Sequence, residues 1–147
     1  MVAAVRGVLP EGMPLLVRLS ATDWVEDRPA WDLEQSVELV DLLKEQGADL
    51  IDVSTGGADQ VKIPTGPGYQ VSFAEEIRRR TGIPTTDVGM IEGPELALSI
   101  LEQGQADAVL IGRQALKDPV WPLRAGHELG MGKNELPNPP SYSRAFW

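Results

Sequence analysis

Two short turns carry the residues whose types and spacing could do chemistry. Gly89 and Met90 follow one predicted strand, and Gly112 and Arg113 follow the next. A glycine lets backbone N–H groups approach an anion closely, and Arg113 adds a permanent cation with a planar set of donors. Taken alone, either glycine could simply permit a tight turn, and Arg113 could simply extend into solvent. Two such turns at successive strand ends favour a phosphate-binding site.

Arg18 is the third feature, because it interrupts the apolar run "PLLVRLS". A cation within an apolar strand is unfavourable unless it is paired or lies at the functional end of the strand. Strand alternation places Leu16, Arg18 and Ser20 on one face. Arg18 is therefore expected either to meet a ligand or to form a buried salt bridge with Asp52 or Asp87.

Composition excludes much ordinary catalysis. The chain of 147 residues has no cysteine and a single histidine, His127, within the predicted last helix "WPLRAGHELG". Disulfides, thiolate zinc sites and cysteine nucleophiles are thereby excluded. A surface position is expected for His127, so the prediction includes no metal site and no Ser–His pair.

The net charge and the hydropathy pattern limit the kinds of partner that the chain could bind. The formal net charge is −9, which disfavours binding to nucleic acid or to an anionic membrane. The basic run Arg78-Arg79-Arg80 is expected to be the solvated last turn of a helix, where cations suit the helix dipole. No stretch resembles a membrane span or a secretory signal, so the expected location is the cytoplasm.

Strands and amphipathic helices alternate along the chain and must position these residues. The predicted strands are 14–20, 48–54, 83–88 and 107–111, and helices are expected at 33–47, 72–82, 94–103 and 121–130, with Ser72 as the N-cap of the second. This alternation predicts an α/β fold with a parallel sheet.

The strand spacing narrows the fold class. Successive strands start roughly 25 to 35 residues apart, the size of a βα unit in a (β/α)8 TIM barrel. Four units predict half of a barrel over residues 1–130, followed by an extended C-terminal tail over 131–147. A doubly wound sheet is the alternative, but "STGGADQ" lacks the glycine fingerprint that it would need.

Several segments together resemble a known family. "PLLVRLSATDW", "GADLIDVSTGG", "GPGYQVSFAEEIR", "VGMI", "ADAVLIGRQALKDP" and "YSRAFW" are similar to the C-terminal half of the old yellow enzymes, which are FMN-dependent ene-reductases. The resemblance is to the bacterial branch of NAD(P)H-dependent FMN oxidoreductases, and it covers essentially the whole chain in order.

The resemblance implies a role for each candidate residue. Arg18 would act catalytically on the N1 and C2-carbonyl side of the flavin. The Gly89–Met90 and Gly112–Arg113 turns would hold the FMN phosphate. Arg144, in the closing "YSRAFW", would reach into the active site of a neighbouring subunit.

The resemblance also implies what the chain lacks. The first four βα units of the family, with their substrate-holding and proton-donating groups, have no counterpart, so a fragment that is inactive alone is expected. The complete enzyme would pass hydride from NAD(P)H through FMN to an activated alkene. Open strand edges and an open apolar sheet face predict a homo-oligomer.

Two other functions stay open at this stage. One is a non-catalytic half-barrel that binds FMN or phosphate. The other is half of a phosphosugar lyase or isomerase barrel, which would need a catalytic lysine or glutamate at a strand end. Lys62 lies in a loop and fits that role poorly.

Overall fold

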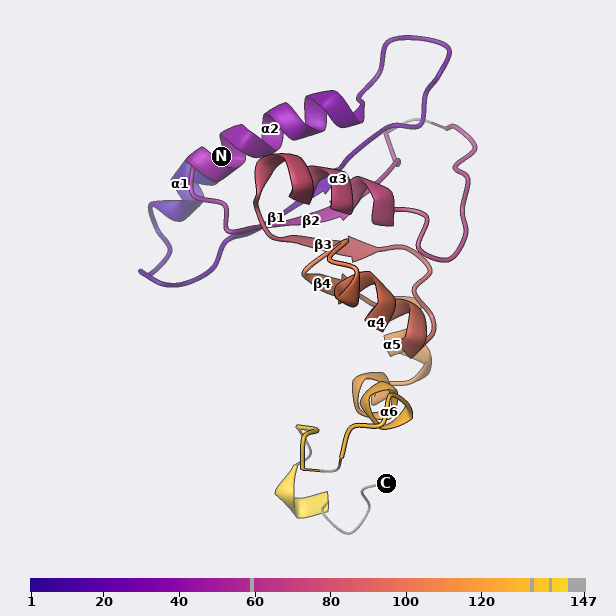
Figure 1. The fold of residues 1–147 in the computed structure, drawn as a ribbon. Coiled ribbons are helices and arrows are strands. Elements are labelled where there is room, and N and C mark those ends of the chain that lie inside the picture. Colours follow the sequence, from indigo (N-terminus) through magenta and orange to yellow (C-terminus); the bar gives the residue numbers. More distant parts are fainter. Residues whose placement is uncertain (59, 133, 138, 143–147) are drawn as a thin grey trace.

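Four parallel strands form a single sheet in the order β1-β2-β3-β4 (Figure 1). A computed structural model describes residues 1–58, 60–132, 134–137 and 139–142. The strands are β1 (Leu16–Ser20), β2 (Leu50–Ser54), β3 (Thr85–Val88) and β4 (Ala108–Leu110). Each lies within its predicted range, and the all-parallel sheet agrees with the expected α/β fold.

Helices connect the strands and continue beyond the last one. They are α1 (Val2–Arg6), α2 (Leu33–Glu45), α3 (Val71–Thr81), α4 (Pro94–Glu102), α5 (Arg113–Lys117) and α6 (Trp121–Glu128), with a 3-10 turn at Pro140–Tyr142. Figure 1 shows α2 and α3 side by side along the sheet, and α6 well away from it, beyond α5. No described helix is long and apolar enough to cross a membrane.

The helix caps differ from the prediction at one position. Ser72 is not the N-cap of α3, because the helix begins at Val71 and Gln70 takes the cap position. The missed cap is at α2, where the Asp32 side chain accepts from the Gln35 backbone N–H and the Gln35 side chain accepts in return from the Asp32 N–H. This reciprocal capping box satisfies two backbone donors at the start of the helix.

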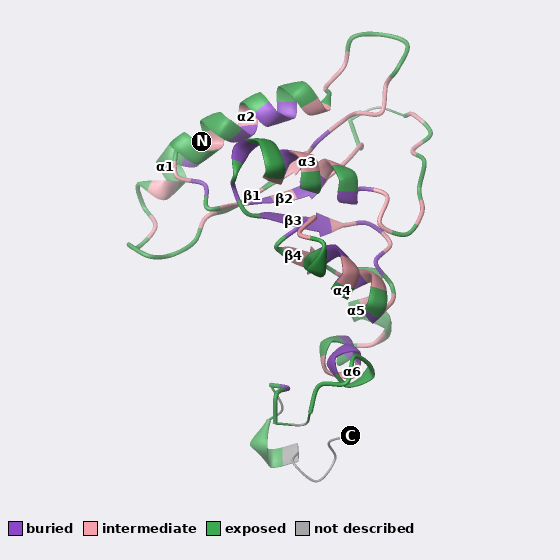
Figure 2. Cartoon of the chain, in the orientation of Figure 1, coloured by how far each residue is buried: buried purple, intermediate pink, exposed green. Residues whose placement is uncertain are grey.

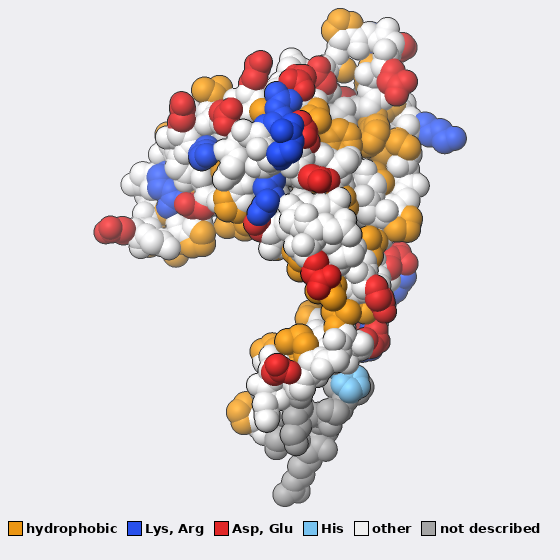
Figure 3. Space-filling view, viewed as in Figure 1, with side chains coloured by type: hydrophobic (Ala, Val, Ile, Leu, Met, Phe, Trp, Pro, Cys, Tyr) orange, Lys and Arg blue, Asp and Glu red, His pale blue; other side chains and the backbone are white. Residues whose placement is uncertain are grey.

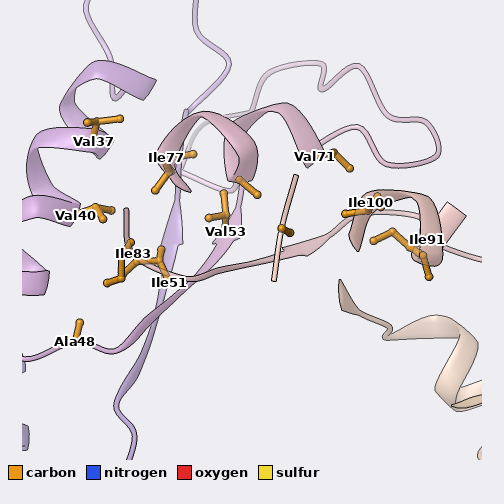
Figure 4. Close-up of a cluster of buried hydrophobic side chains, with 14 of the residues drawn as sticks. Val37, Val40, Ala48, Ile51, Val53, Val71, Ile77, Ile83, Ile91 and Ile100 are labelled. Carbon is orange, nitrogen blue, oxygen red and sulfur yellow. The ribbon is translucent and has the colours of Figure 1, made fainter. Parts of the chain in front are cut away.

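The core lies between the sheet and its helices. Figure 4 shows Val37 and Val40 of α2 and Ile77 of α3 gathered near Ile51 and Val53 of β2. Ile51, Val53 and Ile77 are completely buried, and Figure 2 shows buried residues concentrated in β2, in β3 and on the inner sides of the helices. Burial of these branched apolar side chains, at about 25 cal/mol per Å², holds the strand ends in place.

The face of the sheet opposite the helices is not uniformly apolar, so the expectation of an open apolar sheet face is wrong in part. Arg18, Asp52 and Thr86 are neighbours in register across β1, β2 and β3. Exposed apolar side chains do lie on the two outer strands, where Leu16 is 54% and Leu110 is 38% exposed. The open face therefore combines a polar centre with apolar edges.

The basic run ends α3, as predicted, and each of its cations has an acidic partner. Ion pairs of 2.6 to 2.8 Å join Arg78 to Asp107, Arg79 to Glu76 and Arg80 to Glu34. The Arg78 guanidinium also holds the pKa of the Asp107 carboxyl below its usual value. Figure 3 shows these cations over α3 with acidic side chains beside them. The run therefore links elements of this chain.

Candidate functional site

A cavity of about 390 Å³ opens where the strands end at their carboxyl side. Arg18 of β1 borders it, together with the turns that follow β3 and β4. All five predicted site residues within the described chain line this one cavity: Arg18, Gly89, Met90, Gly112 and Arg113. The carboxyl ends of parallel strands share one edge of a sheet, and this geometry brings together residues far apart in sequence.

The turn after β3 has an unusual backbone. Gly89 has φ 151°, and Met90 follows in the left-handed region at φ 54°. A β-carbon on Gly89 would lie 3.0 Å from both the Gln70 amide nitrogen and the Tyr69 ring. The chain itself therefore requires glycine at position 89. A left-handed non-glycine residue such as Met90 costs about 1 to 2 kcal/mol, a strain that surrounding contacts must offset.

The turn after β4 behaves differently. Gly112 has φ −100° and ψ −78°, on the side of φ space that L-residues ordinarily occupy. A β-carbon there would meet no described atom within 4 Å. Neither packing nor φ requires glycine at this position, and its effect is to leave the cavity wall open at the backbone.

Backbone donors at both turns are unengaged. The N–H groups of Gly89, Met90, Gly112 and Arg113 donate to no backbone carbonyl among the described residues. Gly89 is buried and Met90 half-buried, and such amides normally have a partner, whereas Gly112 and Arg113 are exposed. Four such donors beside the Arg113 guanidinium could bind an anion. Glu92 is the one acidic side chain among the described cavity residues.

Arg18 is paired only loosely. Its guanidinium lies 3.5 Å from the Asp52 carboxylate, and its side chain is 58% exposed. Asp52 also accepts a 3.0 Å hydrogen bond from the Thr86 hydroxyl. The expected buried salt bridge is therefore wrong in its burial, and Asp87 is not a partner. Exposure leaves the donors of Arg18 available to a ligand in the cavity.

Gln70 is a cavity residue that the sequence reasoning missed. Its side chain is almost fully buried and bonds both to Thr55, after β2, and to Val88, at the end of β3. The signal in the sequence was weak, because glutamine is not a preferred N-cap and its partners are 15 and 18 residues away.

Asp87 is a second missed feature. It is completely buried and lies in register between Val53 and Val109, on the helix side of the sheet. Neither of its carboxylate oxygens has a hydrogen-bond partner among the described residues. Burial raises the pKa of Asp87 from 3.8 to about 6; the adjacent Val88 N–H, which forms no hydrogen bond of normal geometry with the carboxylate, opposes this in part, and the nearby Asp52 charge adds a smaller increase.

Other candidate residues lie away from this cavity or outside the description. Lys62 borders a separate cavity with Trp24 and Arg28, as expected for a loop residue without a catalytic position. His127 is exposed on α6. Arg144, predicted to reach a neighbouring subunit, lies outside the described residues.

Comparisons with known proteins agree on one family. Residues 1–131 match the NADH:flavin oxidoreductase / NADH oxidase family. The NADPH dehydrogenases of Geobacillus thermodenitrificans and Bacillus subtilis are 44% and 41% identical to the chain over 133 residues, which are 90% of this chain and 38% of each relative. The chain thus spans well under half of the length of these relatives.

Solved structures confirm the fold class. Histamine dehydrogenase from Rhizobium sp. 4-9 matches with a TM-score of 0.70 at 20% identity, over 88% of this chain and 19% of that chain. An (S)-mandelate dehydrogenase chimera matches with a TM-score of 0.54 at 22% identity, over 88% of this chain and 30% of that chain. The four βα units are therefore part of a (β/α)8 barrel, as the strand spacing predicted.

Proposed function

Because this chain belongs to the NADH:flavin oxidoreductase / NADH oxidase family, which confirms the resemblance to old yellow enzymes, we propose that its cavity binds the phosphate of FMN. One observation carries the proposal: the Gly89–Met90 and Gly112–Arg113 turns line one cavity with unengaged N–H groups and a guanidinium. In a chain of net charge −9, a dianion needs such a local set of donors.

The residues fit the phosphate group sterically as well. Gly112 has open space where a side chain would stand, so a ligand oxygen can approach its backbone closely. Arg113 is exposed beside it, and its guanidinium forms no ion pair with a described residue. The turn after β3 supplies the opposing donors from a backbone held by Gly68 and Gln70.

Arg18 is proposed to act at the other end of the cofactor. Bound FMN would supply the hydride chemistry between NAD(P)H and an activated alkene, and the relatives' name, NADPH dehydrogenase, favours NADPH as the reductant. Arg18 would donate to the N1 and C2-carbonyl side of the flavin and stabilise negative charge there. Asp52, 3.5 Å away, orients that guanidinium while leaving most of its donors free.

Alkene reduction is proposed for the whole protein rather than for residues 1–147 alone. The chain spans 38% of its relatives' length, and the described cavity contains no histidine beside Arg18 to hold a substrate carbonyl. We propose that this stretch contributes cofactor binding and that the remainder of the barrel contributes substrate binding. Flavin binding without alkene reduction is the expected behaviour of residues 1–147.

A flavin titration tests the proposed phosphate site. FMN and riboflavin, which lacks the phosphate, are titrated separately by quenching of flavin fluorescence. We expect Arg113→Ala to weaken FMN binding about tenfold or more, the loss of a charge-assisted contact, with little change for riboflavin. Lys117→Ala is the matched control, because it removes an exposed cation at the other end of α5.

Two results would contradict the phosphate site. Equal binding of FMN and riboflavin by the unaltered chain would show that the cavity does not bind the phosphate group. If Arg113→Ala and Lys117→Ala weaken FMN binding equally, only the overall electrostatic potential of the protein affects that binding.

We also propose that residues 1–147 associate with a second copy. In the described sheet β1 and β4 each pair on one side only, and both outer strands carry exposed leucines, Leu16 and Leu110. Two sets of four parallel strands can close a barrel of eight, which removes both edges. Light scattering at micromolar concentration is expected to give a dimer, and Leu16→Glu should shift it toward monomer. A stable monomer before substitution would refute the association.

A further inference from the structure

The buried Gln70 side chain connects the ends of two strands beside the proposed phosphate site. Its side chain is 3% exposed, yet it forms no cap hydrogen bond to its own helix, α3. Both ends of its amide are used elsewhere. Its nitrogen donates to the Val88 carbonyl, and its oxygen accepts from the Thr55 hydroxyl at 2.7 Å.

The Val88 carbonyl fixes which way the Gln70 amide faces, because a carbonyl oxygen can only accept. The amide nitrogen must therefore face Val88, and the Thr55 hydroxyl, which can donate or accept, donates to the amide oxygen. A buried amide with both ends bonded has one favourable orientation, since a flip would bring two acceptors together at Val88. Thr55, just after β2, anchors the oxygen end of an amide whose nitrogen donates at the end of β3.

The same segment holds the next carbonyl of the turn. The Gly68 N–H donates to the Gly89 carbonyl at 2.8 Å. Two successive carbonyls, those of Val88 and Gly89, are therefore drawn toward residues 68–70. In a trans peptide the N–H points opposite to the C=O, and the chain has no cis peptide among the described residues. The Gly89 and Met90 N–H groups must then point away from residues 68–70.

We propose that Gln70 is a positioning residue that sets the polarity of the Gly89–Met90 turn, so that N–H groups rather than carbonyls face the anion. This inference rests on the proposed phosphate site. It accounts for the unengaged amides at positions 89 and 90. It also gives the φ of 151° at Gly89 a physical origin, because the two fixed carbonyls belong to the peptides on either side of residue 89 and so constrain its φ and ψ.

Gln70→Met tests this role, because methionine is similar in length and flexibility but has no amide. The Val88 carbonyl then loses its donor, and its peptide is free to turn toward the cavity, where a carbonyl oxygen would repel phosphate. We expect the preference for FMN over riboflavin to fall about tenfold or more, while riboflavin binding is retained. Retention of riboflavin binding separates this result from general unfolding.

Two further variants complete the test. Gln105→Met is the matched control, since the Gln105 side chain bonds only to Glu75 at the surface among the described residues, and it should leave the preference unchanged. Thr55→Val keeps Gln70 but removes the hydroxyl that anchors its amide oxygen. It should lower the preference in the same direction by less, and it remains informative if Gln70→Met folds poorly.

Amide spectra without any ligand provide an independent readout. We expect Gln70→Met to move the ¹H–¹⁵N resonances of Gly89 and Met90 strongly, with resonances distant from this turn unchanged. An unchanged FMN preference, or unchanged resonances at these two amides, would overturn the role of Gln70. If the unaltered chain itself shows no preference for FMN, the phosphate site fails first and this inference fails with it.

Discussion

Asp87→Asn is expected to stabilise the protein by about 3 kcal/mol at pH 7.5 and to have almost no effect at pH 3. Burial raises the pKa of Asp87 from 3.8 to about 6, which corresponds to about 1.4 kcal/mol of unfolding free energy per pKa unit. Asparagine has nearly the shape of the protonated acid but cannot ionise. The gain should therefore match the free energy of keeping Asp87 charged in the core.

The sign follows from proton binding. Because the folded pKa lies above the unfolded one, the folded state binds more protons between pH 3.8 and about 6. This residue therefore lowers stability progressively as pH rises through that window, and its penalty is constant above it. Glu34, Glu76 and Asp107 act in the opposite direction, since their pKa values are lowered by Arg80, Arg79 and Arg78.

Urea unfolding of the unaltered chain and of Asp87→Asn at several pH values measures the effect, because the difference cancels the other carboxylates. Asp41→Asn on the exposed side of α2 is the control and should change stability by less than about 0.5 kcal/mol at every pH. A variant no more stable than the unaltered chain at pH 7.5 would mean that Asp87 has found a partner.

Alanine substitutions at Gly89 and Gly112, the two glycines that line the cavity, are expected to affect different quantities, namely the stability of the fold and the affinity for FMN. Gly89→Ala should destabilise the chain by about 2 to 4 kcal/mol, since it combines a backbone region nearly restricted to glycine with a close contact. Those contacts are 3.0 Å to the Gln70 amide nitrogen and the Tyr69 ring, at φ 151°. Gly112→Ala should leave stability unchanged within about 0.5 kcal/mol, because its β-carbon meets no described atom within 4 Å.

Binding should show the reverse pattern for Gly112. Its added methyl group would stand where we place a phosphate oxygen, so FMN affinity should fall about tenfold while riboflavin binding is kept. Thermal unfolding and flavin titration of the same two variants give both quantities. If Gly112→Ala binds FMN as tightly as the unaltered chain, the phosphate does not contact this turn.

The sequence by itself determined the order of the elements and the place of the site. Short apolar runs alternating with amphipathic helices were enough to predict four parallel strands, because their length and the flanking glycines and prolines favour strands, and strands alternating with helices favour a parallel sheet. Parallel strands end at a common edge, so Arg18 and the Gly89 and Gly112 turns were expected together, and all three line one cavity. Local composition and topology suffice for such conclusions.

The tertiary structure alone decided the long-range polar contacts. Whether Arg18 is buried with Asp87 or exposed beside Asp52 depends on which face each strand turns to the helices. That Gln70 bonds to Thr55 and Val88 depends on where α3 begins against two strand ends. Periodicity carries no information on these pairings, because side-chain hydrogen bonds form between residues that are adjacent only after the backbone has packed.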